Sequence, residues 1–340
     1  MKNIFIIFII LVIIISIYTI AYAGNNGQIV FTKSEFTREG FEENILGGFS
    51  KASPEKRGWW ELSRRNICII NPDGTGFRQI TDDGLSYSPR WSPDGSKIAF
   101  CSGPPLMVSL NVINPDGSGR TKLLSDLEQI YDFRWSPDGK KILVFLKTKR
   151  SKDPETWIVS INDKSDVQRM GSGKWARGWN HWEPVGSKVV NPNKRLIEGL
   201  PEGVEWPEWS PDNNYIAFIY NGRLVIANAL KVGMPEPWRP TKTEPPCDRI
   251  GHWSWSPDGK KFLFFAGGNV CSVTLNGEYV RDLSMSWAGH ACWSPDGTKV
   301  AFTSKDGRKR NTEIFIMDSD GTNQIQITNT NYFHEELDWK

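Results

Sequence analysis

The sequence lacks the short motifs that mark the common catalytic and cofactor-binding sites. It has no Gly-x-Ser-x-Gly nucleophile elbow, no phosphate-binding loop and no glycine-rich dinucleotide fingerprint. Its five cysteines include no Cys-x-x-Cys pair, which argues against a zinc cluster and a redox dithiol. The formal net charge is only +2, without the strongly basic balance of nucleic-acid-binding proteins. We therefore expect a protein that is not an enzyme, needs no cofactor and does not bind nucleic acid.

The N-terminus has the pattern of a secretory signal peptide. Lys2 precedes an apolar run from Ile4 to Ile20, and the small residues Ala21 and Ala23 follow it. This order is typical of a signal peptide with an Ala-x-Ala cleavage site, so we expect residues 1–23 to be removed from a periplasmic or secreted protein. The alternative is an uncleaved anchor, since the run approaches the length that spans a bilayer. We expect no other membrane attachment.

The most informative feature that is present is a repeated phrase, Trp-Ser-Pro-Asp. It starts at five positions, Trp91, Trp135, Trp209, Trp255 and Trp293. Ser-Pro-Asp-Gly favours a type I turn, because proline fixes φ at the second position and glycine accepts the positive φ that follows. A short apolar strand comes next, and a second tight turn such as Asn114-Pro-Asp-Gly117 follows one strand later. Four antiparallel strands in a unit of about 44 residues are typical of a β-propeller blade.

The two ends of the chain supply complementary parts of one blade. Residues 335–339 form a first strand with nothing after it, and residues 28–32 form a second strand with nothing before it. We expect them to pair, with further strands near 66–71 and 76–81, so that the C-terminal strand closes the N-terminal blade. The prediction is an all-β, six-bladed propeller over residues 24–340 with an insertion at about 172–203. Seven blades are the alternative, because Trp182 starts a weaker copy of the repeat.

These repeats resemble those of the TolB-like β-propellers, which are similar to WD repeats. The resemblance covers the propeller only, and the separate domain that precedes the propeller in TolB has no counterpart here. It implies a binding or scaffold protein of the cell envelope, with an envelope protein or a peptidoglycan-associated lipoprotein as partner. Carbohydrate binding is the runner-up. A metal-dependent polysaccharide lyase or hydrolase acting at the channel mouth is the enzymatic alternative.

The irregular connections between strands should gather on one face, because both tight turns of each unit lie on the other. We call it the loop face, and its connections include residues 34–63, 148–154, 171–203, 236–250 and 305–311. Two of these connections are rich in aromatic residues, which are enriched at binding hot spots. The predicted binding residues on the loop face are Trp59, Trp60, Trp175, Trp179, His181 and Trp182. The same rings could instead cover the core.

A second candidate site lies at the mouth of the central channel, three residues before each key tryptophan. The residues there are Ser88, Asp132, Trp206, His252, His290 and Glu336. Two histidines and two carboxylates could bind a divalent cation. Arg90 and Arg134, one residue before their tryptophans, could instead pair with the carboxylates in a structural network.

Overall fold

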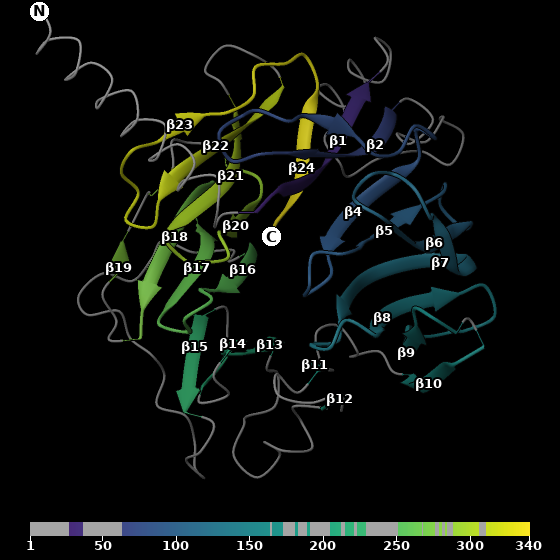
Figure 1. The fold of residues 1–340 in the computed structure, drawn as a ribbon. Helices are drawn as coiled ribbons and strands as arrows, with labels where there is room; N and C mark the ends of the chain where they lie inside the picture. The colour runs from purple at the N-terminus through teal and green to yellow at the C-terminus, as the bar shows by residue number, and fades with distance from the viewer. Residues whose placement is uncertain are drawn as a thin grey trace, which may run out of the picture.

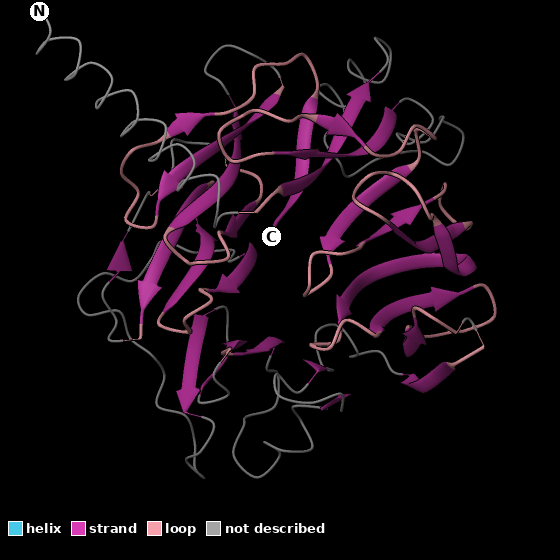
Figure 2. Cartoon of the chain, viewed as in Figure 1, coloured by secondary structure: helices cyan, strands magenta, loops and turns pink. Residues whose placement is uncertain are grey.

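All elements that the structure describes are β-strands (Figure 2). The computed structural model describes residues 27–36, 63–163, 165–172, 181–182, 189–190, 205–211, 215–220, 223–228, 251–266, 268–275, 279–280, 283, 288–305 and 311–340. Each pair of neighbouring strands within its sheets is antiparallel. None of the described segments forms a helix that is long and apolar enough to cross a membrane. The all-β prediction is confirmed, while the predicted signal peptide at residues 1–23 lies outside the described residues.

The strands form successive small sheets, numbered here from the inner strand outward. The sheet that joins the two chain ends contains β24 (Phe333–Trp339), β1 (Ile29–Phe36), β2 (Ser63–Ile70) and β3 (Arg78–Gln79). Two later sheets have the same order, namely β16 (Gly251–Trp255), β17 (Lys261–Ala266), β18 (Asn269–Thr274) and β19 (Tyr279–Val280), then β20 (Ala291–Trp293), β21 (Lys299–Lys305), β22 (Thr312–Asp318) and β23 (Ile325–Gln326). A further sheet has three described strands, β13 (Glu205–Trp209), β14 (Tyr215–Tyr220) and β15 (Arg223–Asn228). Figure 1 shows their inner strands arranged around a common axis.

Two repeat units are merged into one seven-stranded sheet. Its strands are β4 (Ser86–Trp91), β5 (Ile98–Ser102), β6 (Val108–Ile113), β7 (Thr121–Trp135), β8 (Lys141–Thr148), β9 (Glu155–Ser160) and β10 (Val167–Ser172). The 15-residue strand β7 is the outer strand of the first unit and the inner strand of the second. A positive φ of 58° at Asp126 marks the point of change. Within the predicted insertion, β11 (His181–Trp182) and β12 (Val189–Val190) pair with each other.

The repeated phrase folds as a self-contained turn. In the first copy, the Gly95 N–H donates to Ser92 O at 2.9 Å, and Gly95 has a φ of +71°. The Ser92 hydroxyl donates to Asp94 Oδ1 at 2.6 Å and accepts the Lys97 N–H at 2.9 Å. The same two serine contacts occur in the copies at Ser136, Ser256 and Ser294. The predicted turn is confirmed, and each serine links the turn to the strand behind it.

The turn aspartates are expected to make stability sensitive to acid. Hydrogen bonds from Ser92 and Ser96 lower the pKa of Asp94 to about 2. A lowered pKa in the folded state means that this stabilisation is present above the ordinary pKa of 3.8 and is lost as the pH falls through about 2. Asp94→Asn should therefore have a lower melting temperature than the wild type at pH 6, with the difference vanishing near pH 2. Thermal unfolding across this range checks it, and a constant difference would contradict the argument.

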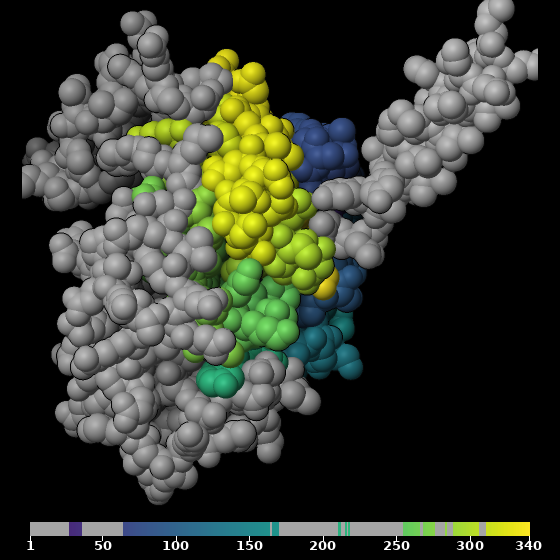
Figure 3. All heavy atoms as spheres, turned by 90° about the vertical axis from the view of Figure 1, so that its left-hand side faces the viewer, coloured from purple at the N-terminus to yellow at the C-terminus, as the bar shows by residue number. Residues whose placement is uncertain are grey.

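The predicted pairing of the chain's end with its start is present. Ile29 lies opposite Trp339 and Val30 opposite Asp338 in the antiparallel register of β1 and β24. The Lys340 N–H extends the ladder by donating to Gln28 O at 3.0 Å. In the side view of Figure 3, the yellow C-terminal residues adjoin both green residues of the preceding sheets and dark-blue residues from early in the chain.

The sheet formed by the two chain ends packs against a neighbour on each side. On one side Val30 and Ile67 share a buried cluster with Trp91 and Phe100 of the next sheet. On the other, Phe31 and Trp339 belong to a cluster that includes Ile314 of the preceding sheet. The cysteines in the described residues, Cys68, Cys101, Cys271 and Cys292, are free thiols, so the bridge that export would permit between the last two is not formed.

Key tryptophans also connect successive units by a directed contact. The indole Nε1 of Trp135 donates to Arg90 O at 3.2 Å, and that of Trp293 donates to Ser254 O at 3.3 Å. In both cases the acceptor is the residue just before the key tryptophan of the preceding unit. The tryptophan of the repeat therefore fixes the relative position of neighbouring inner strands, in addition to burying apolar surface.

Candidate functional site

Each predicted channel-mouth position on β4, β7, β13, β16 and β24 lies at or next to a β-bulge. Register shifts interrupt the inner strands between Tyr87 and Arg90, Ile130 and Asp132, Glu205 and Glu208, and Gly251 and Trp253, and interrupt β24 opposite Val30 and Thr32. A bulge leaves a residue without a partner in the ladder and redirects its side chain. Ser88 and Glu336 take this further, with positive φ values of 53° and 56°. The bulges are a regular feature that the sequence pattern did not predict.

Glu336 connects the inner strand β24 to β4. Its Oε2 accepts the Ser88 N–H at 2.6 Å and the Thr32 hydroxyl at 2.8 Å, and its Oε1 accepts the Ser88 hydroxyl at 2.7 Å. Next to it, Asp338 Oδ2 accepts the Trp91 N–H at 2.7 Å. Burial raises the pKa of Asp338, although the nearby Arg90 charge opposes this. Both carboxylates thus hold neighbouring sheets together.

Asp132 forms a separate, solvent-accessible ion-pair group. Arg90 Nη2 lies 3.1 Å and Arg134 Nε 3.4 Å from its carboxylate oxygens, and its side chain is 36% exposed. Desolvation alone would raise the pKa of Asp132, but the charges of Arg90 and Arg134 outweigh it and lower the pKa. Exposed pairs of this kind are worth about 0–1 kcal/mol each. For this carboxylate the observed contacts are those of the structural network considered above.

The remaining channel-mouth residues have different surroundings. His290 is half-buried; its N–H donates to Thr303 Oγ1 at 3.0 Å and its carbonyl accepts the Thr303 N–H at 2.8 Å. Trp206 and His252 lie in β13 and β16, but their side chains lie outside the described part of the chain. Within the described residues, no three His, Cys, Asp or Glu side chains are grouped so as to hold a metal ion.

The structure describes little of the predicted aromatic surface. Trp59, Trp60, Trp175 and Trp179 lie outside the described residues. His181 and Trp182 form β11, opposite Val190 and Val189, and only their backbone is described.

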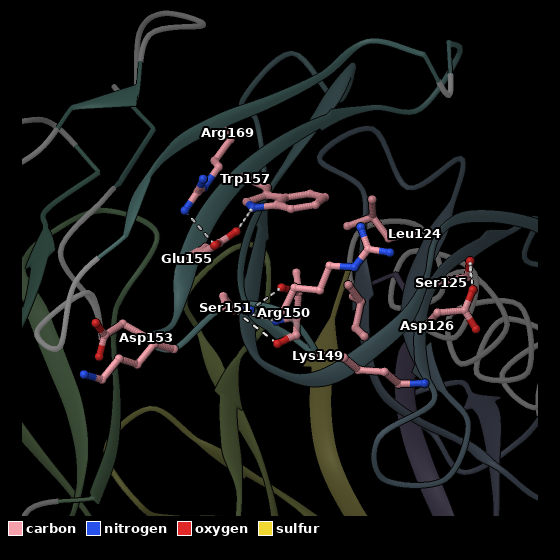
Figure 4. Close-up of a pocket in the computed structure, with 13 residues that line it drawn as sticks. Leu124, Ser125, Asp126, Lys149, Arg150, Ser151, Asp153, Glu155, Trp157 and Arg169 are labelled. Carbon is pink, nitrogen blue, oxygen red and sulfur yellow. Dashed lines mark hydrogen bonds and ion pairs between the residues drawn. The ribbon is translucent and has the colours of Figure 1, made fainter.

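A cavity of about 770 Å³ opens on the loop face (Figure 4). It lies between the connection at residues 148–154 and the part of β7 around Leu124–Leu127, and is bordered by β9 and β10. The first of these segments is among the connections predicted for the loop face, and the second joins two repeat units. The candidate face therefore contains a cavity, at a place other than the aromatic connections.

Glu155 organises one wall of this cavity. Its side chain is only 6% exposed, and its Oε1 pairs with Arg169 Nη2 at 2.7 Å. Its Oε2 accepts the indole N–H of Trp157 at 2.7 Å. Trp157 and Glu155 are two residues apart on β9, so both side chains project to the same side of the strand. The half-buried indole is therefore held in one orientation at the edge of the cavity (Figure 4).

The opposite wall presents cationic side chains on a tight turn. The Ser151 N–H donates to Thr148 O at 3.3 Å, and the Thr148 N–H donates to Ser151 Oγ at 3.0 Å. Lys149 and Arg150 stand exposed at the tip of this turn. In Figure 4 the Arg150 guanidinium points toward the side chains of Leu124 and Trp157. Among the described residues, neither cation forms an ion pair.

Comparison with solved structures identifies the architecture. TolB from Acinetobacter baumannii superposes with a TM-score of 0.56 at 18% identity, over 92% of this chain and 66% of that one. The β-propeller domain of the Trilobed protease from Pyrococcus furiosus gives 0.55 at 20% identity, over 82% of this chain and 93% of the domain. The fold is that of a TolB-like β-propeller. The resemblance seen in the repeats is confirmed at this level, although no family model matches the sequence.

Two curated proteins match parts of this TolB-like propeller. A TolB homologue of Chlorobium luteolum is 39% identical over 62 residues, which make up 17% of this chain and 13% of that protein. Dipeptidyl-peptidase 5 of Porphyromonas gingivalis is 27% identical over 188 residues, or 49% of this chain and 27% of the peptidase. The chain thus matches less than a third of the length of either relative. Proteins named as TolB and proteins named as peptidases share this propeller, and the fold is compatible with both.

Proposed function

We propose that this chain is an exported, non-enzymatic binding module that recognises a protein of the cell envelope through its loop face. The observation that carries the proposal is the loop-face cavity, where a fixed indole faces exposed cations on a rigid sheet scaffold. Rigid scaffolds that present aromatic and basic groups from loops are typical of binding proteins. An envelope protein, for example a peptidoglycan-associated lipoprotein, is the proposed partner.

We propose further that the scaffold is a ring of six blades. Six inner strands, β4, β7, β13, β16, β20 and β24, each end at a tryptophan of the repeat. The pairing of β24 with β1 and the packing of this sheet on both sides support closure through the chain ends. Such a ring leaves no open sheet edge in the direction around the axis.

The lining of the cavity favours binding over catalysis. None of its lining residues is a histidine or a cysteine, so it contains no pair of the kind that activates a nucleophile. Its one buried carboxylate, Glu155, is engaged by Trp157 and Arg169. A peptidase activity, suggested by some relatives, would need groups that the described cavity does not present.

Site-specific photo-crosslinking in living cells tests the proposal. A photoreactive residue at Lys149, on the loop face, should capture a defined envelope protein, whereas one at the exposed Phe77, outside the cavity, should not. The captured protein must then bind the purified chain directly. N-terminal sequencing of the exported protein should start at Gly24. Equal capture from both positions, or retention of the chain in the cytoplasm with residues 1–23 intact, would overturn the proposal.

A further inference from the structure

We propose that the cavity beside residues 148–154 binds a peptide segment in which an acidic side chain stands next to an aromatic or large apolar one. This inference rests on the proposed function, because it takes the loop face to bind protein. It adds the part of that face that makes contact and the chemistry of the partner. It stands on three features, namely a preorganised apolar wall, an excess of positive charge and the absence of a free buried acceptor in the cavity lining.

The apolar wall is formed before any ligand arrives. Leu124 and Leu127 are buried, and the Trp157 ring is held by its hydrogen bond to Glu155. A ring that is already fixed loses little conformational entropy when a partner side chain packs on it. The volume of about 770 Å³ falls within the roughly 300–1,000 Å³ typical of ligand pockets. Such a space accommodates one aromatic side chain with its neighbour rather than an extended protein surface.

The charge of the lining selects an anion. Four cationic side chains and three carboxylates line the cavity. Glu155 and Arg169 neutralise each other at 2.7 Å, so that Lys149, Arg150 and Lys152 face only Asp126 and Asp153. The Arg150 guanidinium, directed at the apolar wall, can donate two parallel hydrogen bonds to one carboxylate. A carboxylate beside an apolar side chain therefore satisfies both walls at once.

The same groups fit a neutral sugar poorly. Sugar hydroxyls are best bound where free acceptors and donors surround an aromatic ring, but Glu155, the buried acceptor next to Trp157, is already engaged twice. The charged groups that point into the space with no described partner are donors. An acidic peptide is thus favoured over a neutral glycan, and an acidic glycan becomes one outcome of the test.

Two phage-displayed heptapeptide libraries, screened against the purified full-length exported protein, provide the test. One library fixes Phe-Glu at its centre and the other fixes Phe-Gln. We expect enrichment from the first library alone. Enriched peptides are then synthesised and their affinities measured by fluorescence anisotropy, with thermal unfolding used to verify that every variant is folded.

The variants separate the two walls from the rest of the surface. Arg150→Gln should weaken binding about tenfold, and Arg150→Lys less, because lysine retains charge but loses the paired donors. Trp157→Leu should also weaken it about tenfold. Arg78→Gln removes an equally exposed cation on β3, away from the cavity, and should change nothing. Raising the ionic strength from about 0.05 to about 0.5 M should weaken wild-type binding more than that of Arg150→Gln.

Several outcomes would overturn the inference. These are equal enrichment from both libraries, unchanged affinity of Arg150→Gln, or Arg150-dependent binding of polygalacturonate without any peptide binding. Failure here is distinguishable from failure of the proposed function. Capture of an envelope protein from Lys149 without acidic-peptide binding would leave the scaffold role standing and reject the partner chemistry. Peptide binding without a captured envelope protein would do the reverse.

Discussion

Removal of residues 333–340 is expected to abolish the folded state. The deletion takes away β24, which pairs with β1 and covers Ile29 and Phe31. It also uncovers the apolar residues of the preceding sheet that pack on Trp339, and leaves two sheet edges unpaired. Circular dichroism and size-exclusion chromatography should show an unfolded or aggregated chain. Recovery of a monomer with the wild-type melting temperature would contradict the role assigned to β24.

A single substitution gives the same prediction in graded form. Trp339 is 6% exposed and packs in the cluster with Ile29 and Ile316. Trp339→Ala should lower the free energy of unfolding by about 3–5 kcal/mol, the usual cost of truncating a large buried ring. Phe77→Ala is the matched control, because Phe77 is 44% exposed, and it should cost less than about 1 kcal/mol. Denaturant unfolding measures both.

Glu313→Ala is expected to be nearly as destabilising. Glu313 is fully buried on β22, where Oε1 accepts Asn311 Nδ2 at 2.8 Å and the Thr330 N–H at 2.8 Å. Its Oε2 accepts the Thr328 hydroxyl at 2.7 Å. Truncation leaves these donors buried without their acceptor, which should cost about 3–5 kcal/mol. The carboxylate is tolerated in the interior only because so many donors converge on it.

The control for Glu313 is an exposed carboxylate with a single partner. Glu35 pairs with Lys33 Nζ at 2.6 Å, but its side chain is 47% exposed. Glu35→Ala should change the free energy of unfolding by less than about 1 kcal/mol. Glu313→Gln keeps the shape but directs an amide donor at other donors, so it should also destabilise. Similar stabilities for the two alanine variants would show that the hydrogen bonds around Glu313 contribute little.

The features predictable from the sequence are those that depend on local chemistry. Ser92, Asp94 and Gly95 form the turn through contacts within a few residues, so each repeat could be interpreted on its own. The pairing of β24 with β1 was predictable because each chain end lacks what the other supplies. By contrast, β7 serves two units without a break, a result of the single positive φ at Asp126 that no residue type announces.

The cavity escaped prediction because its parts come from different strands. Residues 148–154 were recognised as a loop-face connection, but Trp157 and Arg169 lie in strands and looked like core and edge residues. Their contacts with Glu155 depend on the pairing of β9 with β10, which contains a register shift between Arg169 and Gly171. The alternation Glu-x-Trp on β9 was the one available signal that both side chains share a side of the strand.

The hydrogen bond from Thr32 to Glu336 joins residues separated by 304 positions. A ribosome or a translocation pore delivers residue 32 long before residue 336, so the sheet that contains β1 must wait, incomplete, until the last segment emerges. Non-local closure of this kind slows folding. The chain can therefore be kept in an extended, transport-competent form during synthesis and reach its final shape only once delivery is finished.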